Sequence, residues 1–374
     1  MHGDFVLKLS IIIAVYNRRD ELQELLDSLV YQTDKNFEVI IVDDGSKEKL
    51  EFAAENYHGK LDLKYFYKFN SGAGLARNYG SRRASGSYFL FLDSDCIVPP
   101  DYIQNVRKEL KTNYVDAFGG ADSAHVSFND MQKAISYSMT SLFTTGGIRG
   151  NKKAVARFQP RSFNMGISKE AFEAVGGFSE MRIGEDPDLS LTLWEKGFQT
   201  RFFSDCKVFH KRRTSLRKFS NQVYHFGIAR PILNQRHPVY TKITFWFPTL
   251  FIFFTVFALL SILCYLFIPK NTILYDSLYG EFYKYSQDNR AYIAREFSLL
   301  PFVFLVLYGL IIFFDSTLKN KSLKVGFLSL IAVFVQFFSY GFGFLQSFTA
   351  LNILRQKPEK IFPSHYYKSS ERGN

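Results

Sequence analysis

Short apolar runs alternate with helical patterns over the first hundred residues. The runs cover residues 8–17, 36–46, 61–69 and 88–93, and each has the length of a β-strand. Between the first two runs, four leucines recur at helical spacing, at Leu22, Leu25, Leu26 and Leu29. Residues 47–57 and 74–85 also have helical character. Apolar strands that alternate with helices predict an α/β domain, with a mostly parallel sheet covered on both faces.

Polar side chains follow the ends of three of these runs. They are Asn17, Asp43, Asp44, Asp93 and Asp95. In open α/β sheets, ligands bind beyond the carboxyl ends of the strands, so one cleft could hold all five. Asp93 and Asp95 are two positions apart and would face the same side of an extended chain. Two adjacent carboxylates suit a hard divalent cation such as Mg²⁺ or Mn²⁺, although solvated aspartates that end a strand are the alternative.

The last third of the chain is far more apolar. Residues 243–269, 297–314 and 325–354 contain no charged side chain, and a bilayer core needs about 20 apolar residues as a helix. Three spans are therefore predicted. The third contains Gln336, Gln346 and several glycines, so it could be kinked, buried against its neighbours or re-entrant.

The charges suggest which side of the membrane each part occupies. The chain has 46 Lys and Arg against 35 Asp and Glu, and its three cysteines form no metal-ligand or disulfide pattern. No long apolar core follows Met1, so we expect the large domain, residues 1–213, to stay in the cytosol. A basic, amphipathic segment, 214–242, precedes the membrane region, 243–354, as the positive-inside rule predicts. The tail, 355–374, is also basic, which argues against a third crossing and leaves the topology open.

Several motifs, in order, resemble the family 2 glycosyltransferases. SIIIAVYNR, IIVDDGS, NSGAGLARNYG and YFLFLDSDC resemble the nucleotide-sugar half of that family. FNMGISKEAFEAVGGF and GEDPDLSLTLWEKG resemble the acceptor half, so the likeness covers roughly residues 8–215. It implies the GT-A fold and an inverting, hexosyltransferase-type reaction that depends on Mg²⁺ or Mn²⁺, with UDP-sugars favoured as donors.

The resemblance also implies a role for each matching residue. Asp186, in a Glu-Asp motif with Glu185, would be the catalytic base. Donor contacts would come from Tyr16, Asn17, Asp43, Asp44, Arg77 and Asp93, and Glu185 would also contact substrate. The metal ligands would be Asp95, Asp93 and His210.

Simpler interpretations remain open for four of these positions. Glu185 and Asp186 precede an apolar helical pattern and could be helix N-terminal charges that favour the helix dipole. Arg77 could be a charge on a helix surface, and His210 a surface residue in a basic run.

The acceptor is expected to be lipid-linked or a glycan at the membrane, and no nucleic acid partner is expected. Residues 207–219 hold six Lys and Arg, which would favour an anionic leaflet. Processive relatives carry Gln-x-x-Arg-Trp near this point, whereas this chain has Gln222, His225 and Phe226, which favours a single transfer. The alternatives are a processive synthase, a silent nucleotide-sugar-binding membrane protein, or a phosphotransferase. A multi-pass protein of a bacterial inner membrane is the expected location.

Overall fold

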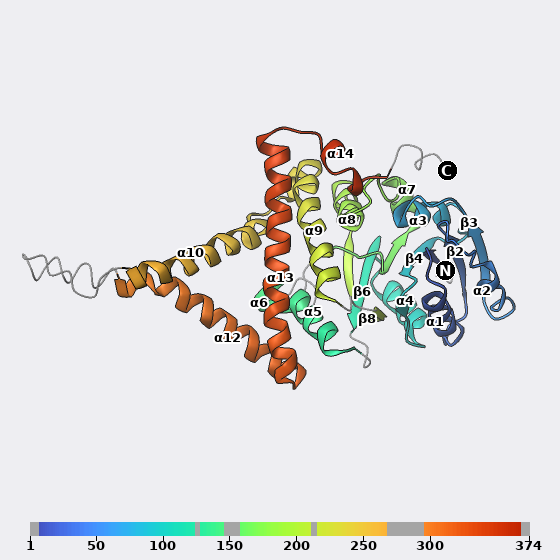
Figure 1. Ribbon diagram of the computed structural model, residues 1–374. Coiled ribbons are helices and arrows are strands. Elements are labelled where there is room, and N and C mark those ends of the chain that lie inside the picture. The colour runs from blue at the N-terminus through green and yellow to red at the C-terminus, as the bar shows by residue number, and fades with distance from the viewer. Residues whose placement is uncertain (1–6, 124–127, 146–157, 211–214, 268–294, 368–374) are drawn as a thin grey trace, which may run out of the picture.

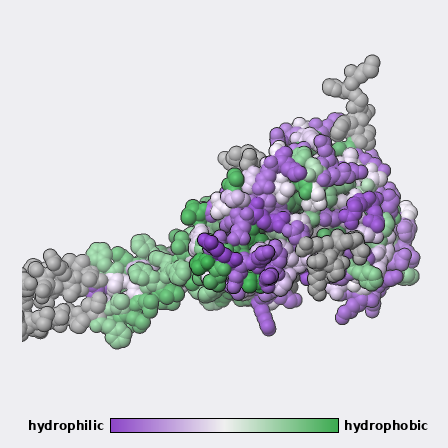
Figure 2. Space-filling view, turned by 90° about the horizontal axis from the view of Figure 1, so that it is seen from above, coloured by the Kyte–Doolittle hydropathy of each residue, from purple (hydrophilic) through white to green (hydrophobic). Residues whose placement is uncertain are grey.

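The protein has an α/β domain and a helical extension (Figure 1). The structure, a computed structural model, describes residues 7–123, 128–145, 158–210, 215–267 and 295–367. Polar residues gather on the α/β domain, whereas apolar residues cover the extension (Figure 2). The separation of a polar α/β part from an apolar part that begins at about residue 240 is therefore seen in the structure as well as in the sequence.

The α/β domain is built on an eight-stranded sheet in the order β3-β2-β1-β4-β7-β6-β8-β5. Neighbouring strands among β1 to β4 are parallel, and β7 is antiparallel to β4 and β6. The prediction of a mostly parallel α/β sheet is thus confirmed for its first half, with an antiparallel insertion in its second. The strands are β1 (Leu9–Val15), β2 (Phe37–Asp43), β3 (Asp62–Tyr67), β4 (Tyr88–Asp93), β5 (Cys96–Ile97), β6 (Ala117–Ser123), β7 (Asn164–Ser168) and β8 (Thr200–His210).

Successive strand residues point to opposite faces of this sheet, so its apolar strands place apolar side chains on both faces. Helices cover both faces and bury these side chains. Ile11 and Ile13 belong to one buried core and Ile12 to the other. The four leucines at helical spacing are all buried on α1, in the first of these cores. The helices of the domain are α1 (Arg19–Val30), α2 (Glu51–Glu55), α3 (Ala73–Ser81), α4 (Tyr102–Thr112), α5 (Asp130–Thr140), α6 (Leu142–Thr145), α7 (Lys169–Ala174) and α8 (Glu185–Glu195).

Long helices make up the C-terminal part. They are α9 (Leu216–Arg236), α10 (Phe247–Phe267), α12 (Leu300–Asn320) and α13 (Leu323–Phe348). Within the described residues, three segments are long and apolar enough to cross a membrane: Ile243–Phe267, Arg295–Asn320 and Leu323–Ile353. They match the three predicted spans to within a few residues. In Figure 1, α10 and α12 run out together to one side, and α13 runs across their inner ends, next to α9.

After α13, the chain returns to the α/β domain through α14 (Pro358–Ile361). The backbone of Met181 pairs with that of Tyr366. Arg182 N–H donates to the His365 carbonyl at 2.7 Å, and Tyr367 N–H donates to the Glu180 carbonyl at 2.9 Å. We call residues 362–367 the C-terminal strap.

Candidate active site

The ends of three parallel strands bring the predicted polar residues to one edge of the sheet. Strand pairing places Val15 opposite Asp43, and Ala14 opposite Asp93. Because β1 lies between β2 and β4, the residues that follow β1 lie between these two aspartates.

A cavity of about 350 Å³ opens at this edge. Its lining includes five of the predicted residues, which are Tyr16, Asp44, Arg77, Asp93 and Asp95. Four further predicted residues with described side chains are not part of this lining, namely Asn17, Asp43, Glu185 and Asp186, and the side chain of the tenth, His210, lies outside the described part. Further lining comes from residues to which sequence reasoning gave no role at a donor site, and they include Arg18, Ser94, Ile135, Met139 and Gln222.

Asn17 and Asp43 organise the loop that follows β2. Asn17 has a left-handed backbone with φ of 53°, and its N–H donates to Ser46 Oγ at 2.9 Å. Asp43 is fully buried and accepts hydrogen bonds from Ser46 N–H, Leu50 N–H and the Tyr65 hydroxyl, at 2.9, 3.1 and 2.7 Å. Both residues therefore hold the loop next to the cavity without lining the cavity themselves.

Asp44 lines the cavity and holds the start of α3. Its carboxylate accepts hydrogen bonds from Gly72 N–H at 2.6 Å and from Ser71 N–H at 2.9 Å. Lys68 Nζ lies 3.1 Å from the same carboxylate, in a buried ion pair. The position of α3, which carries Arg77, therefore depends on Asp44.

Arg77 is almost fully buried and pairs with Asp93, with 2.6 Å between Nη2 and Oδ1. Burial lowers the pKa of Arg77, but the charges of Asp93, Asp186 and Glu185 outweigh it and hold that pKa above its usual value. Its Nε and Nη1 atoms are buried without a hydrogen-bond partner among the described residues. A buried guanidinium that lines a cavity with unsatisfied donors is suited to an anionic ligand.

Arg18 pairs with Asp95, so each carboxylate of the Asp93-Ser94-Asp95 motif has a guanidinium partner. Burial lowers the pKa of Arg18, but Asp95 outweighs it and raises that pKa. Nothing in the sequence around Arg18 distinguishes it from its neighbour Arg19, because the contact joins residues 77 positions apart.

Glu185 and Asp186 open α8, after Gly184, which has a φ of 93°. Burial raises the pKa of both carboxyl groups; the Asp186 charge adds to the rise at Glu185, and Arg77 and Arg161 oppose the rise at Asp186. Asp186 Oδ1 is buried and has no hydrogen-bond partner among the described residues. A raised pKa and an unsatisfied oxygen are properties expected of a general base.

A divalent metal ion would require the carboxylates of Asp93 and Asp95 to face the same site. Asp93 and Asp95 line the same cavity, and carboxylate oxygens are the ligands that Mg²⁺ and Mn²⁺ prefer, so these residues fit such an ion. The backbone of His210 pairs with Cys96, directly after Asp95, but the His210 side chain lies outside the described part. Among the side chains that the structure describes, no group of three or more His, Cys, Asp or Glu is placed to hold a metal.

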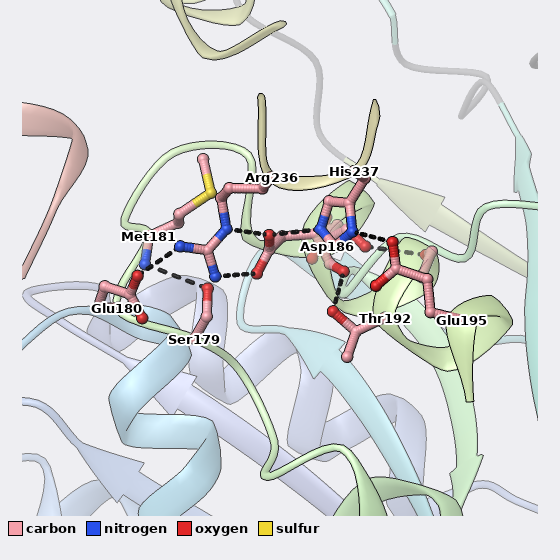
Figure 3. Close-up of polar contacts among 10 residues, drawn as sticks. Ser179, Glu180, Met181, Asp186, Thr192, Glu195, Arg236 and His237 are labelled. Carbon is pink, nitrogen blue, oxygen red and sulfur yellow. Dashed lines mark hydrogen bonds and ion pairs between the residues drawn. The ribbon is translucent and has the colours of Figure 1, made fainter. Parts of the chain in front are cut away.

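A second polar cluster joins α8 to the end of α9, and the sequence did not indicate it (Figure 3). Asp188 is buried. Its carboxylate accepts a hydrogen bond from Arg236 Nε at 2.8 Å and is hydrogen-bonded to His237 Nε2 at 3.0 Å. Glu195 bonds to His237 Nδ1 at 2.7 Å, and Glu180 accepts from Arg236 Nη1 at 2.5 Å. Burial lowers the pKa of His237, but the two carboxylates outweigh it and raise that pKa. The cluster fixes the helix that begins with Glu185 and Asp186 against α9.

One wall of the cavity comes from the helices next to the membrane region. Ile135 and Met139 lie on α5, and Gln222 lies on α9. Ile135 and Met139 share a buried cluster with Ala332 of α13. The cavity therefore reaches from the strand ends to α5 and α9, and α5 packs on the apolar helix α13.

Comparison with known proteins identifies the family of the chain. The model of the family described as "Glycosyl transferase family 2" matches residues 10–176. An uncharacterized glycosyltransferase of Haemophilus influenzae is 32% identical over 218 residues, which cover 56% of this chain and 70% of that protein. One of Rickettsia typhi is 45% identical over 114 residues, covering 30% of this chain and 35% of that protein. The chain spans only 16% to 35% of the length of five such Rickettsia relatives.

A solved structure shares the fold. The mannosyltransferase PcManGT of Pyrobaculum calidifontis, in complex with GDP-Man and Mn²⁺, has a TM-score of 0.51 and 18% sequence identity. The match covers 79% of this chain and 88% of that protein. The predicted GT-A fold is thus confirmed.

Proposed function

Because the chain belongs to family 2 of the glycosyltransferases, we propose that it transfers a sugar from a nucleoside diphosphate sugar to an acceptor at the membrane. The transfer would invert the anomeric carbon, with a UDP-hexose as the donor. The catalytic domain, residues 1–213, would face the cytosol, where nucleotide sugars are made, and the apolar helices would anchor it in a bacterial inner membrane.

The arrangement of two acidic sites around Arg77 carries this proposal. Asp93 and Asp95 line the cavity, whereas Glu185 and Asp186 lie outside its lining, yet the charges of Asp93 and Asp186 both act on Arg77. An inverting transfer needs one acidic site for the leaving diphosphate and another for the attacking acceptor. The same two-site requirement is not expected of a protein that only binds a sugar.

On the donor side, Tyr16 and Asp44 would contact the nucleoside, and Asn17 and Asp43 would hold the loop that shapes its pocket. The unsatisfied Nε and Nη1 of Arg77 would donate to the diphosphate, which removes the cost of leaving these buried donors unpaired. Asp95, Asp93 and His210 would hold a Mg²⁺ or Mn²⁺ ion, which would neutralise charge on the leaving diphosphate. Arg18 would have to release Asp95 for this to occur.

On the acceptor side, Asp186 would take the proton from the attacking hydroxyl group, and Glu185 would bind the acceptor or the transferred sugar. If the acceptor is a lipid phosphate, its ionised oxygen would attack without a base. The wall of the cavity formed by Ile135, Met139 and Gln222 favours an acceptor that comes from the membrane side.

The test is nucleoside diphosphate release by the detergent-solubilised full chain, with a panel of nucleotide sugars, Mg²⁺ or Mn²⁺, and a membrane lipid extract. We expect release from one donor, a fall of about 10²–10⁴-fold in Asp186→Asn, and loss in Asp95→Ala. Asp62→Asn, an exposed change on β3, is the matched control and should keep full activity.

Three outcomes would contradict parts of the proposal. Donor binding without release, equal in wild type and Asp186→Asn, would favour a silent binding protein. Products longer than one added sugar would favour a processive synthase. Loss of release in Asp95→Ala but not in Asp186→Asn would favour attack by a phosphate oxygen over attack by a hydroxyl group.

A further inference from the structure

The helices α10 and α12 form a hairpin that leaves the α/β domain and comes back to it. Both expose large apolar side chains along their length, among them Phe253, Phe257 and Leu260 on α10 and Phe304, Leu307 and Ile311 on α12. At the outer end of the hairpin, Arg295 Nε donates to the Tyr265 carbonyl at 3.1 Å.

The inner end of α12 contacts the α/β domain. Near that end, the Tyr137 hydroxyl on α5 donates to Asp315 Oδ2 at 2.7 Å. The Tyr308 hydroxyl, near the middle of α12, donates to the Phe143 carbonyl of α6 at 3.0 Å. Since α10 follows α9 after a short connection, residues 237–246, the hairpin starts and ends on the side of the α/β domain. Each helix has 21 residues and is about 32 Å long, which suits a bilayer core of about 30 Å.

The third apolar helix, α13, lies along α9. Ser220 and Ser339 hydroxyls are 2.8 Å apart, and Tyr224 donates to Gln346. A Cβ atom on Gly227 would overlap the Tyr340 carbonyl, and one on Gly343 would overlap the Tyr224 carbonyl, so the two backbones are in direct contact. The helix α9 carries Arg217 and Lys218 in its first turn and Arg230 and Arg236 in its last two turns. A helix with these charges does not lie in hydrocarbon, so α13 beside it does not either.

Both ends of α13 are attached to the α/β domain. At its start, Lys324 Nζ lies 2.9 Å from Asp130 Oδ2, at the beginning of α5. Beyond its end, the C-terminal strap pairs with residues 180–182, and Gly74 N–H donates to the Tyr367 hydroxyl at 2.9 Å. A helix of 26 residues is about 39 Å long and would separate its two ends by the whole bilayer core if it crossed.

We propose that only α10 and α12 cross the membrane, and that α13 lies at the membrane surface on the side of the α/β domain. There it would contact the headgroup and acyl boundary of the lipid bilayer through its few exposed apolar residues, Leu323, Phe327 and Phe342. The basic residues Arg355 and Lys357 then stay on the side of the basic segment before α10, as the positive-inside rule favours. The cavity wall that packs on α13 lies at the lipid surface, next to the acceptor we propose.

The test is labelling of single cysteines with a membrane-impermeant maleimide, in sealed vesicles of each orientation. The background carries Cys264→Ala, since Cys96 and Cys206 are buried. Lys111→Cys on α4 reports the side of the α/β domain, and Glu296→Cys reports the outer end of the hairpin. Lys321→Cys and Glu359→Cys report the two ends of α13. All four positions are exposed.

Two crossings predict that Lys111→Cys, Lys321→Cys and Glu359→Cys react from one side and Glu296→Cys from the other. Reaction of Glu359→Cys from the side of Glu296→Cys would overturn the proposal. Reaction of all four from one side would overturn it as well, because the hairpin would not cross.

A second measurement does not depend on vesicle orientation. Spin labels at Phe327→Cys and Phe342→Cys lie fifteen residues apart, about 22 Å along α13. We expect equal, shallow depths for them in power-saturation measurements, and a deep position for Phe257→Cys on α10. A depth difference of about 20 Å between the two α13 labels would mean that the helix crosses. Neither experiment depends on the proposed transferase activity.

Discussion

The contact between Tyr367 and α3 gives a prediction that separates stability from donor binding. Gly74 lies in the first turn of α3, one turn before Arg77, and its buried N–H donates to the Tyr367 hydroxyl at 2.9 Å. A Cβ atom on Gly72 would overlap the Tyr367 ring, so the strap is packed directly against this turn. The charges of Glu185 and Arg77 both act on the Tyr367 hydroxyl, which places it near these two residues.

Tyr367→Phe should therefore weaken both the fold and the donor site. The change leaves a buried N–H without an acceptor, at a cost of about 1–3 kcal/mol. If about half of this cost is transmitted to the position of Arg77, donor affinity should fall by about 2–12-fold, since 1.4 kcal/mol is tenfold. The measurements are the melting temperature in detergent and donor Kd by calorimetry.

Tyr57→Phe is the matched control. Its hydroxyl donates to Asp27 Oδ1 at 2.8 Å and to the Gln23 carbonyl at 3.2 Å, away from the cavity. It should lower the melting temperature to a similar extent and leave donor Kd unchanged. If Tyr367→Phe lowers the melting temperature as Tyr57→Phe does, with the same donor Kd as wild type, the strap is a structural attachment only and the reasoning is wrong.

Four further outcomes test other parts of the structure. Burial raises the pKa of Asp186, so kcat/KM for a hydroxyl acceptor should fall as the pH drops through that raised pKa; a rate that stays flat down to pH 4 would contradict Asp186 as the base. For the same reason ionised Asp186 destabilises the fold, so Asp186→Asn should raise the melting temperature at pH 8 and lose this advantage at low pH. Arg18→Gln should strengthen Mn²⁺ binding several-fold in the absence of donor, measured by EPR, because Arg18 no longer competes for Asp95; unchanged binding would rule out this competition. Gly343→Ala should cost about 1–3 kcal/mol by forcing α13 from α9, whereas Gly309→Ala, whose Cβ would meet only Leu330 at 3.4 Å, should melt like wild type.

The sequence predicted those features that depend on neighbours along the chain. Leu22, Leu25, Leu26 and Leu29 form the buried face of α1, because the helical repeat alone brings them together. The strand ends place Asp44, Asp93 and Asp95 on one cavity, because parallel strands end at one edge of a sheet.

Other features depend on contacts that no local pattern encodes. Arg18 and Arg19 are indistinguishable in the sequence, yet only Arg18 reaches Asp95. The pairing of Asp188 with His237 joins residues 49 positions apart, and that of Gly74 with Tyr367 joins residues 293 apart. The sequence does not distinguish Asp43 from Asp44, but the buried Asp43 carboxylate accepts hydrogen bonds from the loop after β2 and so fixes that loop. Such roles follow only from the packing of distant elements.

The helix α13 shows why apolar composition alone does not define a membrane span. An apolar helix is required wherever both of its faces are buried, either by lipid or by protein. The helix α13 packs on α9 and α5 and on α10 and α12, and 39% of its most apolar window is buried within the protein, against 28% for α10 and 6% for α12. Glycines at 341 and 343 allow α10 and α9 to approach α13 closely. In the topology that we propose, protein contacts explain the apolar character of α13, and its attached ends, not its hydropathy, decide on which side of the bilayer it would lie.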